Sequence, residues 1–390
     1  MQGWLLHTNA EKLNPEAKKS SGFFPKEATG HRVTFRDITI QEYENRLRAY
    51  SQPQKIFCYF ATIKTENDAG KLKVFMTPVD FLRSLRPGLR QPEGLGLNEF
   101  RNMTREKVKK LKFKGLAKDS IFYKLRPDGL ITFCDFLYLV MLLTMPEKYF
   151  KMGFRLFEQQ ENGNLGIRDM NTLVLGITHD DLFKNISAVH FYFFGPHLTQ
   201  KLSLDKFLEF RRQLQHDVLL LEFNLLLKKR KPTDANKPPN KTISEVCFAK
   251  LLLKCSSMSK AEKTETLIRI NKKYQPLKRG ITQDEFMSFF EFVQHLPDIE
   301  TALSYHYLAG ADISRGALKH ISDVLVGVPL SPHLIDVIFT VFNAPNSGIL
   351  GRNGFIEALR HRMLRCKHTS LKLADLYGSV LKCVKETWIV

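Results

Sequence analysis

The most regular feature of the sequence is a pair of apolar positions that recurs along most of the chain. An aliphatic residue is followed five positions later by a large apolar residue, and successive pairs begin between 32 and 41 residues apart. A Thr, Ser or Gly usually comes directly after the aliphatic residue. A repeat of this length indicates one supersecondary unit that is used many times. The seven pairs are Ile131/Phe136, Leu165/Met170, Leu202/Phe207, Ile243/Phe248, Ile281/Phe286, Ile313/Leu318 and Leu350/Phe355.

Each pair fits the second half of an EF-hand, a helix–loop–helix unit built around a twelve-residue loop. The aliphatic residue would occupy the eighth loop position, where two loops pair through a short β-bridge, and the hydroxyl residue after it would cap the exiting helix. The apolar residue at position thirteen would begin the buried face of that helix. We therefore predict a mainly α-helical array of EF-hand-like units, with a generic helical repeat of similar period as the alternative.

Breaks in the repeat predict the domain boundaries. The stretch 228–241 contains three prolines and many basic residues, which is typical of a solvated linker between two lobes. Three units precede the linker in a first lobe at 120–227, and four follow it in a second lobe at 242–368. The region before residue 120 lacks the repeat. We expect a flexible segment at 1–34, a small α/β domain at 35–119 and a final amphipathic helix at 369–390.

The loop at 158–169 is the best candidate for a calcium site. An EF-hand holds calcium with about six or seven oxygen atoms, usually including carboxylates at the first and last loop positions. Only two of its ligand positions carry a carboxylate: Glu158 is longer than the usual Asp, and Asp169 is short for bidentate contact. We therefore expect weak calcium binding or none. The candidate ligands are Glu158, Gln160, Asn162, Asn164 and Asp169.

The last loop, Asn343 to Gly354, contains no carboxylate and is predicted not to bind calcium. Pro345 stands at its third position, Gly354 at its twelfth, and Arg352 adds a positive charge. The other five units also lack complete ligand sets. We therefore expect no cofactor, with Ca²⁺ as a weak ligand at most.

The charge balance is strongly basic, with 59 Lys and Arg residues against 40 Asp and Glu, a formal net charge of +19. Such a surplus favours anionic partners, which include nucleic acid, anionic lipid and acidic protein surfaces. The basic residues cluster at 105–118, in the linker and at 360–367. No nucleic-acid-binding signature accompanies these clusters, so nucleic acid is not expected as a partner.

The sequence also disfavours several classes of protein. No Walker loop, dinucleotide fingerprint, nucleophile elbow or kinase signature is present, so we expect no enzymatic activity. No apolar run approaches the roughly 18 to 20 residues of a membrane span. None of the six cysteines forms a CxxC pair or fits a zinc-site spacing.

Several longer segments closely resemble the mitochondrial calcium uptake proteins, the EF-hand regulators of the mitochondrial calcium uniporter. The resemblance extends from about residue 35 to about residue 387. The segments that carry it are EYENRLRAYSQPQKIFCYFATIK (42–64), VFMTPVDFLRSL (74–85), QPEGLGL (91–97), DSIFYKL (119–125), YFFGPHLTQKLSLDKFLEFRRQLQHDVLLLEF (192–223), DIETALSYHYLAGA (298–311) and LKCVKET (381–387).

The resemblance implies a protein of the mitochondrial intermembrane space, peripheral on the inner membrane, that controls calcium import through the uniporter. It implies contacts with the pore subunit and its acidic accessory subunit, and a dimer with itself or with a paralogue. Cys383 matches a cysteine that ties the family's dimers through an intermolecular disulfide. The positions that match the family's partner-binding arginines are Arg46, Arg48, Arg83, Arg360, Arg362 and Arg365.

This sequence departs from the family in its calcium ligands. Members that sense calcium keep acidic residues in the first and last EF-hands, and this chain has lost them in both. The basic run that usually precedes the N-terminal domain is reduced to Lys18 and Lys19, and no clear targeting segment is present. The leading hypothesis is therefore a divergent paralogue with degenerate EF-hands, which keeps the contact surface but senses calcium weakly or not at all. The alternative is a calcium-independent scaffold that binds anionic lipid or an acidic protein outside the uniporter.

Overall fold

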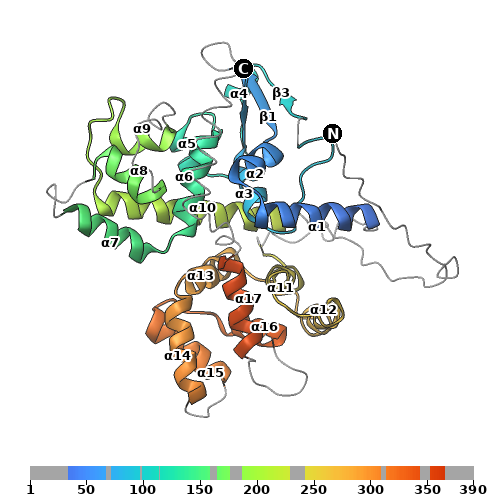
Figure 1. Ribbon diagram of the computed structural model, residues 1–390. Helices are drawn as coiled ribbons and strands as arrows, with labels where there is room; N and C mark the ends of the chain where they lie inside the picture. Colours follow the sequence, from blue (N-terminus) through green and yellow to red (C-terminus); the bar gives the residue numbers. More distant parts are fainter. Residues whose placement is uncertain are drawn as a thin grey trace, which may run out of the picture.

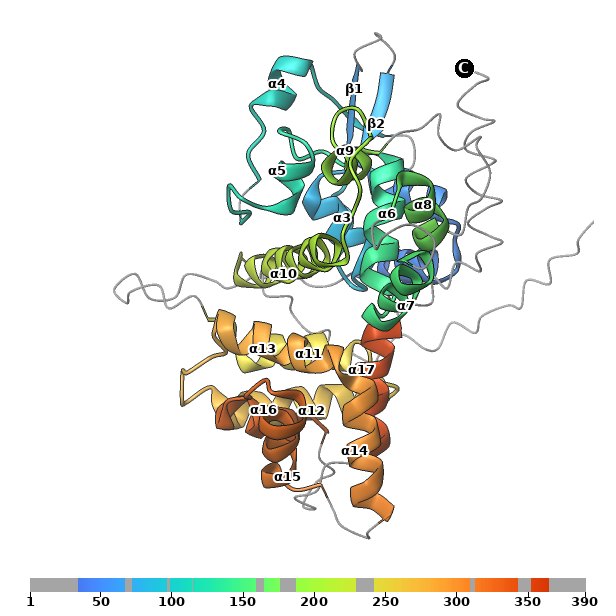
Figure 2. The ribbon, with the colours of Figure 1, turned by 90° about the vertical axis from the view of Figure 1, so that its left-hand side faces the viewer.

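The chain folds into two helical lobes that meet along one long helix, α10 (Figures 1 and 2). Elements α1 to α9 lie on one side of α10 and elements α11 to α17 on the other. The predicted fold class, mainly α with a small amount of sheet near the N-terminus, is confirmed. The computed structural model describes residues 34–66, 72–96, 99–113, 115–158, 165–175, 187–228, 242–308, 313–342 and 352–364.

The first lobe contains short helices and one small sheet. In chain order its elements are α1 (Phe35–Tyr50), α2 (Pro53–Phe60), β1 (Ile63–Glu66), β2 (Leu72–Phe75), α3 (Pro78–Leu85), β3 (Arg101–Asn102), α4 (Arg105–Lys109), α5 (Ile121–Leu125), α6 (Phe133–Thr144), α7 (Glu147–Glu158), α8 (Ile167–Leu175), α9 (Ala188–Phe194) and α10 (Leu204–Lys228).

The second lobe is entirely helical in its described residues. Its elements are α11 (Glu245–Leu253), α12 (Lys260–Tyr274), α13 (Gln283–Gln294), α14 (Leu296–Leu308), α15 (Arg315–His320), the π-helix η2 (Ile321–Val326), α16 (Pro332–Phe342) and α17 (Arg352–Leu364).

The repeat has the geometry that the sequence predicts. Leu165 pairs with Leu202, and Ile243 with Ile281, through isolated antiparallel β-bridges between loops. The hydroxyl residues that follow the aliphatic positions cap the exiting helices: Thr132 and Thr282, for example, each accept the backbone N–H three residues on. The residues at position thirteen are all buried, which fixes one face of each exiting helix in the core: Phe136, Met170, Phe207, Phe248, Phe286, Leu318 and Phe355.

The expectation that the repeat begins only at residue 120 is wrong, because an earlier unit lies in the N-terminal region. Met76 forms an antiparallel bridge with Ile131, and Phe81, five residues after Met76, is fully buried. Thr77 caps α3 as Thr132 caps α6. The Ile131 unit therefore has a partner, one unit more than the seven that the sequence repeat indicates.

The small sheet explains why this first unit is hard to see in the sequence. Strands β1 and β2 pair antiparallel with Ile63 opposite Phe75, and β3 adds to β1 in parallel, giving the order β2-β1-β3. The strands occupy the place of the loop between α2 and α3, so the usual loop spacing is lost. Residues of α2 and α3 nevertheless share one apolar core with α6 and α10, so the segment before residue 120 packs as part of the first lobe.

Helix α10 connects the two cores. It has 25 residues, which corresponds to a length of roughly 37 Å. Its earlier part, including Phe207 and Leu214, packs in the core of the first lobe, whereas Leu219 and Phe223 pack in the core of the second. Phe223 contacts Phe286 with a ring-centroid distance of 5.3 Å. Within the described residues, no helix is both long enough and apolar enough to cross a membrane.

Candidate functional site

The carboxylate at the last loop position, which would be a bidentate calcium ligand, is held by hydrogen bonds inside the fold. In the Ile131 unit this residue is Asp135, which is 2% exposed. Its Oδ2 accepts the N–H (3.0 Å) and the hydroxyl (2.7 Å) of Thr132. Its Oδ1 accepts the hydroxyl of Ser187 (2.6 Å) and the N–H of Ala188 (2.7 Å). A carboxylate has about four acceptor positions, so Asp135 is saturated as a cap of α6 and α9.

Asp80 occupies the same position in the first unit and is equally engaged. Its Oδ2 accepts the N–H of Thr77 (3.0 Å) and the hydroxyl of Thr62 (2.5 Å). Its Oδ1 forms an ion pair with Arg83 at 2.8 Å. The side chain is buried and stabilises the start of α3 rather than facing an open loop.

Other loops carry residues at this position that cannot act as carboxylate ligands. Lys206 stands there in the Leu202 unit, and its ammonium donates to the carbonyl of Phe193 at 3.2 Å. Ala317 stands there in the Ile313 unit, where its N–H is bonded to the Ser314 hydroxyl at 3.1 Å. A cation or a methyl group in place of the bidentate Glu removes the ligand on which calcium affinity depends most.

The candidate calcium loop, 158–169, is described only at its two ends. Glu158 is the last residue of α7, and Gln160, Asn162 and Asn164 lie outside the described residues. Asp169 accepts the N–H of Gly166 at 2.9 Å, the same capping contact that Asp135 makes. Most of the final loop, up to residue 351, is also outside the described residues, so the expectations for both loops stay predictions. Across the part of the chain that is described, no group of three His, Cys, Asp or Glu side chains is placed to hold a metal ion.

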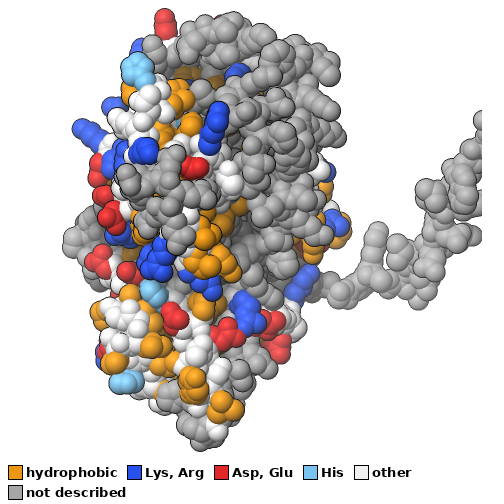
Figure 3. All heavy atoms as spheres, turned by 60° about the vertical axis from the view of Figure 1, so that its left-hand side comes forward, with side chains coloured by type: hydrophobic (Ala, Val, Ile, Leu, Met, Phe, Trp, Pro, Cys, Tyr) orange, Lys and Arg blue, Asp and Glu red, His pale blue; other side chains and the backbone are white. Residues whose placement is uncertain are grey.

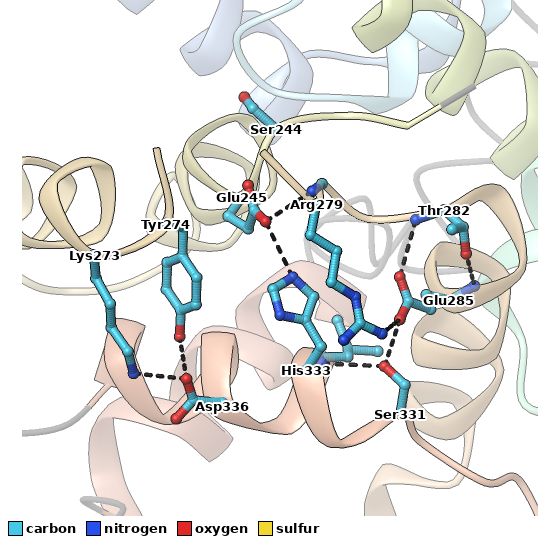
Figure 4. A network of polar contacts seen from close by, with 12 residues as sticks. Ser244, Glu245, Lys273, Tyr274, Arg279, Thr282, Glu285, Ser331, His333 and Asp336 are labelled. Carbon is cyan, nitrogen blue, oxygen red and sulfur yellow. Dashed lines mark hydrogen bonds and ion pairs between the residues drawn. The ribbon is translucent and has the colours of Figure 1, made fainter. Parts of the chain in front are cut away.

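A polar network joins loops and helices of the second lobe (Figure 4). Glu285, at the last position of the Ile281 loop, accepts the N–H of Thr282 (3.0 Å) and the hydroxyl of Ser331 (2.6 Å). Glu245 accepts the N–H of Gly280 at 2.9 Å and lies 3.0 Å from Nε2 of His333, which is buried as well. These contacts between protein groups tie α11, α13 and α16 together.

Tyr274 belongs to the same network and begins the Ile281 loop, at the position of the first calcium ligand. Its hydroxyl donates to Oδ2 of Asp336 at 2.6 Å, and the ammonium of Lys273 reaches the same oxygen at 2.6 Å. Burial, together with the bond to Asp336, raises the pKa of Tyr274. A buried neutral phenol thus replaces the usual carboxylate and keeps α12 in contact with α16.

Arg48 is a structural residue and does not lie on a surface that a partner could reach. It is 6% exposed, and its guanidinium forms an ion pair with the buried Glu44 at 3.2 Å. It also donates to the carbonyls of Arg83 (2.8 Å) and Leu89 (2.5 Å) and stacks over the ring of Phe60 at 4.5 Å. These contacts fasten the segment after α3 to α1, so the expectation that Arg48 contacts a partner is not supported by its position.

Arg362 is likewise buried and paired. Its Nη2 lies 2.9 Å and 2.8 Å from the two carboxylate oxygens of Glu222, and its guanidinium covers the ring of Phe290 at 4.6 Å. Arg86 reaches the same carboxylate at 3.1 Å from the segment after α3. Burial opposes ionisation of Glu222, but the two arginines outweigh it and lower the pKa of this carboxyl. Sequence reasoning did not identify Glu222, because its two partners lie more than a hundred residues away on either side.

Three of the predicted partner-binding arginines are accessible. Arg46 is exposed on α1, Arg83 is partly exposed beside Asp80, and Arg360 is exposed on α17 and forms an ion pair with Glu300. Arg365 and Cys383 lie outside the described residues, as do the final predicted helix and nearly all of the predicted linker. On the face drawn in Figure 3, the Lys and Arg side chains of described residues lie among acidic and hydrophobic ones, not in one continuous basic field.

Helix–loop–helix units that pair through loop bridges, with capping contacts at the last loop position, define an array of degenerate EF-hands. An EF-hand domain pair matches residues 309–362. The chain is 35% identical over 384 residues to calcium uptake protein 1, mitochondrial, of Rattus norvegicus, covering 93% of this chain and 78% of the relative. It is 37% identical over 379 residues to calcium uptake protein 1 homolog, mitochondrial, of Caenorhabditis elegans, covering 92% and 69%. The chain therefore belongs to the mitochondrial calcium uptake protein family, as the sequence resemblance predicts.

Solved structures share the fold. The crystal structure of EFHA2 in its apo state aligns with a TM-score of 0.61 at 25% identity, covering 81% of this chain and 98% of the other. The apo structure of the mitochondrial calcium uniporter protein MICU2 aligns with a TM-score of 0.60 at 22% identity, covering 87% and 98%, which shows a likeness of fold alone.

Proposed function

We propose that this protein is a non-catalytic regulatory subunit of the mitochondrial calcium uniporter that has little or no calcium sensing of its own. Its relatives are named mitochondrial calcium uptake proteins, which supports a role in calcium import in that organelle. The lack of calcium sensing is proposed from the residues that occupy the last loop position. In the described units that position holds a capping carboxylate such as the saturated Asp135, or a lysine (Lys206), an alanine (Ala317) or a cysteine (Cys247).

A calcium ion would have to displace bonds that already stabilise the fold. At Asp135 it would replace four donors from α6 and α9, and at Glu285 it would break the contact to Ser331 on the neighbouring unit. The binding free energy would be reduced by the cost of these bonds, whereas a sensor loop binds calcium with its ligands otherwise free.

The partner surface in this proposal consists of the accessible arginines Arg46, Arg83 and Arg360. The proposal also includes Arg365, which lies outside the described residues. Guanidinium groups suit acidic surfaces because they pair with carboxylates in a fixed two-pronged geometry. Their partners would be the pore subunit and its acidic accessory subunit, reached from the intermembrane space at the inner membrane. A dimer with itself or a paralogue, linked through Cys383, completes the proposal.

Calcium binding is tested by isothermal titration calorimetry of the full-length protein in calcium-free buffer. We expect no saturable heat up to about 100 µM calcium, because sensor loops bind in the range of roughly 10⁻⁷ to 10⁻⁵ M. Saturable binding at micromolar calcium would refute the loss of sensing. Such a result would not contradict the proposal that the protein is a subunit of the uniporter.

Partner binding is tested by co-purification of the uniporter from mitochondria that express tagged protein. Arg46→Glu should reduce recovery of the pore subunit, because Arg46 is exposed and has no ion pair among the described residues. Lys272→Glu is the matched control: the same charge reversal on an exposed residue of α12 should leave recovery unchanged. Arg83 is better tested as Gln, since Glu would repel Asp80 and disturb the cap of α3.

The same experiment separates the alternative function. A wild-type protein that fails to recover the uniporter but sediments with vesicles containing cardiolipin would favour a calcium-independent lipid-binding scaffold. The dimer is tested on its own by non-reducing electrophoresis. A band of twice the mass that disappears in Cys383→Ser would support the intermolecular disulfide.

A further inference from the structure

The basic segment 101–118 lies at the end of the first lobe that is opposite the second lobe (Figures 1 and 2). It contains β3, α4 and the chain that leads to α5. Eight of its residues are Lys or Arg, and only Glu106 is acidic. Most of this segment is one of the three basic clusters of the sequence, and the proposed partner surface does not include it.

Apolar side chains anchor the segment to the rest of the first lobe. Val108 is buried in a small core with Ile63 and Phe75 of the sheet. Further along, the ring of Phe113 stacks on that of Tyr123 at a centroid distance of 6.4 Å. The N–H of Phe113 also donates to the hydroxyl of Tyr123 at 3.0 Å. These apolar residues pack into the lobe and leave the basic residues between them on the surface.

Five basic side chains of the segment are exposed and have no ion pair with a described residue. They are Arg101, Lys107, Lys110, Lys112 and Lys118. Their charges are therefore not neutralised within the part of the chain that the structure describes. The Debye length at physiological ionic strength is about 8 Å, so charges this exposed act on an anionic surface that comes into direct contact with them.

The composition of this surface favours a lipid bilayer over a protein as the anionic partner. Four of the five side chains are lysines, and lysine is depleted in protein–protein interfaces, whereas arginine is enriched there. Protein interfaces also depend on a few large side chains that become buried, and no large hydrophobic side chain among the described residues of 101–118 is exposed. Clusters of about four to eight basic residues beside a membrane are typical of binding to anionic headgroups.

We propose that the five exposed basic residues of 101–118 form a docking surface for an anionic phospholipid bilayer. The ammonium and guanidinium groups pair with headgroup phosphates, and no apolar side chain inserts, so the contact is electrostatic and reversible. Each basic residue close to an anionic bilayer strengthens binding by about fivefold. The contact requires no channel subunit, so it does not depend on the proposed function.

Co-sedimentation of the full-length protein with phosphatidylcholine vesicles that contain phosphatidylglycerol tests this surface. The wild type should bind these vesicles but not vesicles of phosphatidylcholine alone. It should be released when the salt concentration is raised from about 0.1 M to about 0.5 M. The triple variant Lys107→Gln, Lys110→Gln, Lys112→Gln should bind about a hundredfold more weakly. Circular dichroism should show an unchanged fold, because all three side chains are exposed.

The matched control replaces three exposed lysines of the second lobe: Lys250→Gln, Lys272→Gln and Lys278→Gln. It removes the same net charge far from the proposed surface and should weaken binding by less than about threefold. Equal weakening by the two triple variants, binding that does not respond to salt, or no binding of the wild type would overturn the proposal.

An acidic protein as the true partner would give a different pattern. The triple variant at 107, 110 and 112 would then bind vesicles as the wild type does but recover less pore subunit from mitochondria, which would also overturn the proposal. Because the vesicle measurements do not involve the uniporter, they can fail while the proposed function holds.

Discussion

The Ser187 hydroxyl donates a 2.6 Å hydrogen bond to Asp135, 52 residues away in the chain. Asp135 stands where calcium would take its bidentate ligand, and Ser187 is the N-cap of α9. The contact shows how protein donors alone can hold the carboxylate at this loop position. Asp135 caps two helices, α6 and α9, through these bonds.

Asp135→Asn should destabilise the protein by about 2–3 kcal/mol. The substitution replaces one carboxylate oxygen by an NH₂ group, which is a donor, so the protein donors that face it lose their acceptor. Urea unfolding followed by circular dichroism measures the loss. Asp205→Asn, at an exposed position in the first turn of α10, is the control and should change stability by less than about 0.5 kcal/mol. For each variant, the loss of stability measured in EGTA should equal the loss measured in millimolar calcium. A loss for Asp135→Asn that depends on calcium would show that Asp135 acts as a metal ligand.

His190 should make the stability of the first lobe depend on pH. Its Nδ1 accepts the N–H of Ser187 at 3.1 Å, and its Nε2 lies 2.8 Å from Oδ1 of Asn171, so the folded structure holds the neutral ring. Burial lowers the pKa of His190 from its ordinary 6.5 to about 4, although Asp135 acts in the opposite direction. The unfolded chain therefore binds a proton at a higher pH than the folded chain does.

The resulting stabilisation is complete above pH 6.5 and is lost as the pH falls from there to about 4. The shift corresponds to about 3 kcal/mol. Urea unfolding at pH 7 and at pH 4.5 should show this loss in the wild type. His190→Asn, whose short side chain can keep the cap but cannot titrate, should lose markedly less. Equal pH dependence in the two proteins would assign the effect to other groups.

The sequence predicts the repeat and its caps well because both depend on local residue types. An aliphatic residue, a hydroxyl residue and a large apolar residue at fixed spacing are enough to place Ile281, Thr282 and Phe286 correctly. The unit at Met76 and Phe81 is missed because a β-hairpin interrupts the loop that would reveal it. An insertion inside a loop changes the spacing of the repeat in the sequence, but the β-bridge between the two loops can still form.

The site residues could be predicted less completely, because the burial of an arginine depends on distant parts of the chain. Arg46 and Arg48 are two residues apart and look alike in the sequence, yet they point from different faces of α1. Arg48 meets Glu44 and Asn45 on its own helix, but its other partners come from α2, from α3 and from the segment that follows α3. Only tertiary contacts separate the exposed member of the pair from the buried one.

Arg48→Gln should therefore destabilise the protein by roughly 3–5 kcal/mol, since it leaves the buried Glu44 without its ionic partner. Arg46→Gln, on the exposed face of the same helix, should change stability by less than about 0.5 kcal/mol. Urea unfolding of the two variants side by side measures the difference. Similar small losses would show that Arg48 is accessible in solution and available to a partner.

Gly280 and Gly327 provide a matched test of the packing between paired loops. Both adopt left-handed backbone angles, with φ of +71° and +72°. A Cβ on Gly280 would lie 2.8 Å from the Thr242 hydroxyl and 2.9 Å from the carbonyl of Ile243, whereas a Cβ on Gly327 would meet nothing within 4 Å. Gly327→Ala should cost only the backbone strain, about 1–2 kcal/mol.

Gly280→Ala should cost this strain and in addition about 1–3 kcal/mol for the clash. The clash falls beside the bridge between Ile243 and Ile281, so exchange of those two amide hydrogens should also accelerate. Urea unfolding and hydrogen exchange on both variants separate the two contributions. If Gly280→Ala and Gly327→Ala lower the free energy of unfolding equally, the two paired loops can move apart with little loss of stability. The bridge would then contribute less to the second lobe than its geometry indicates.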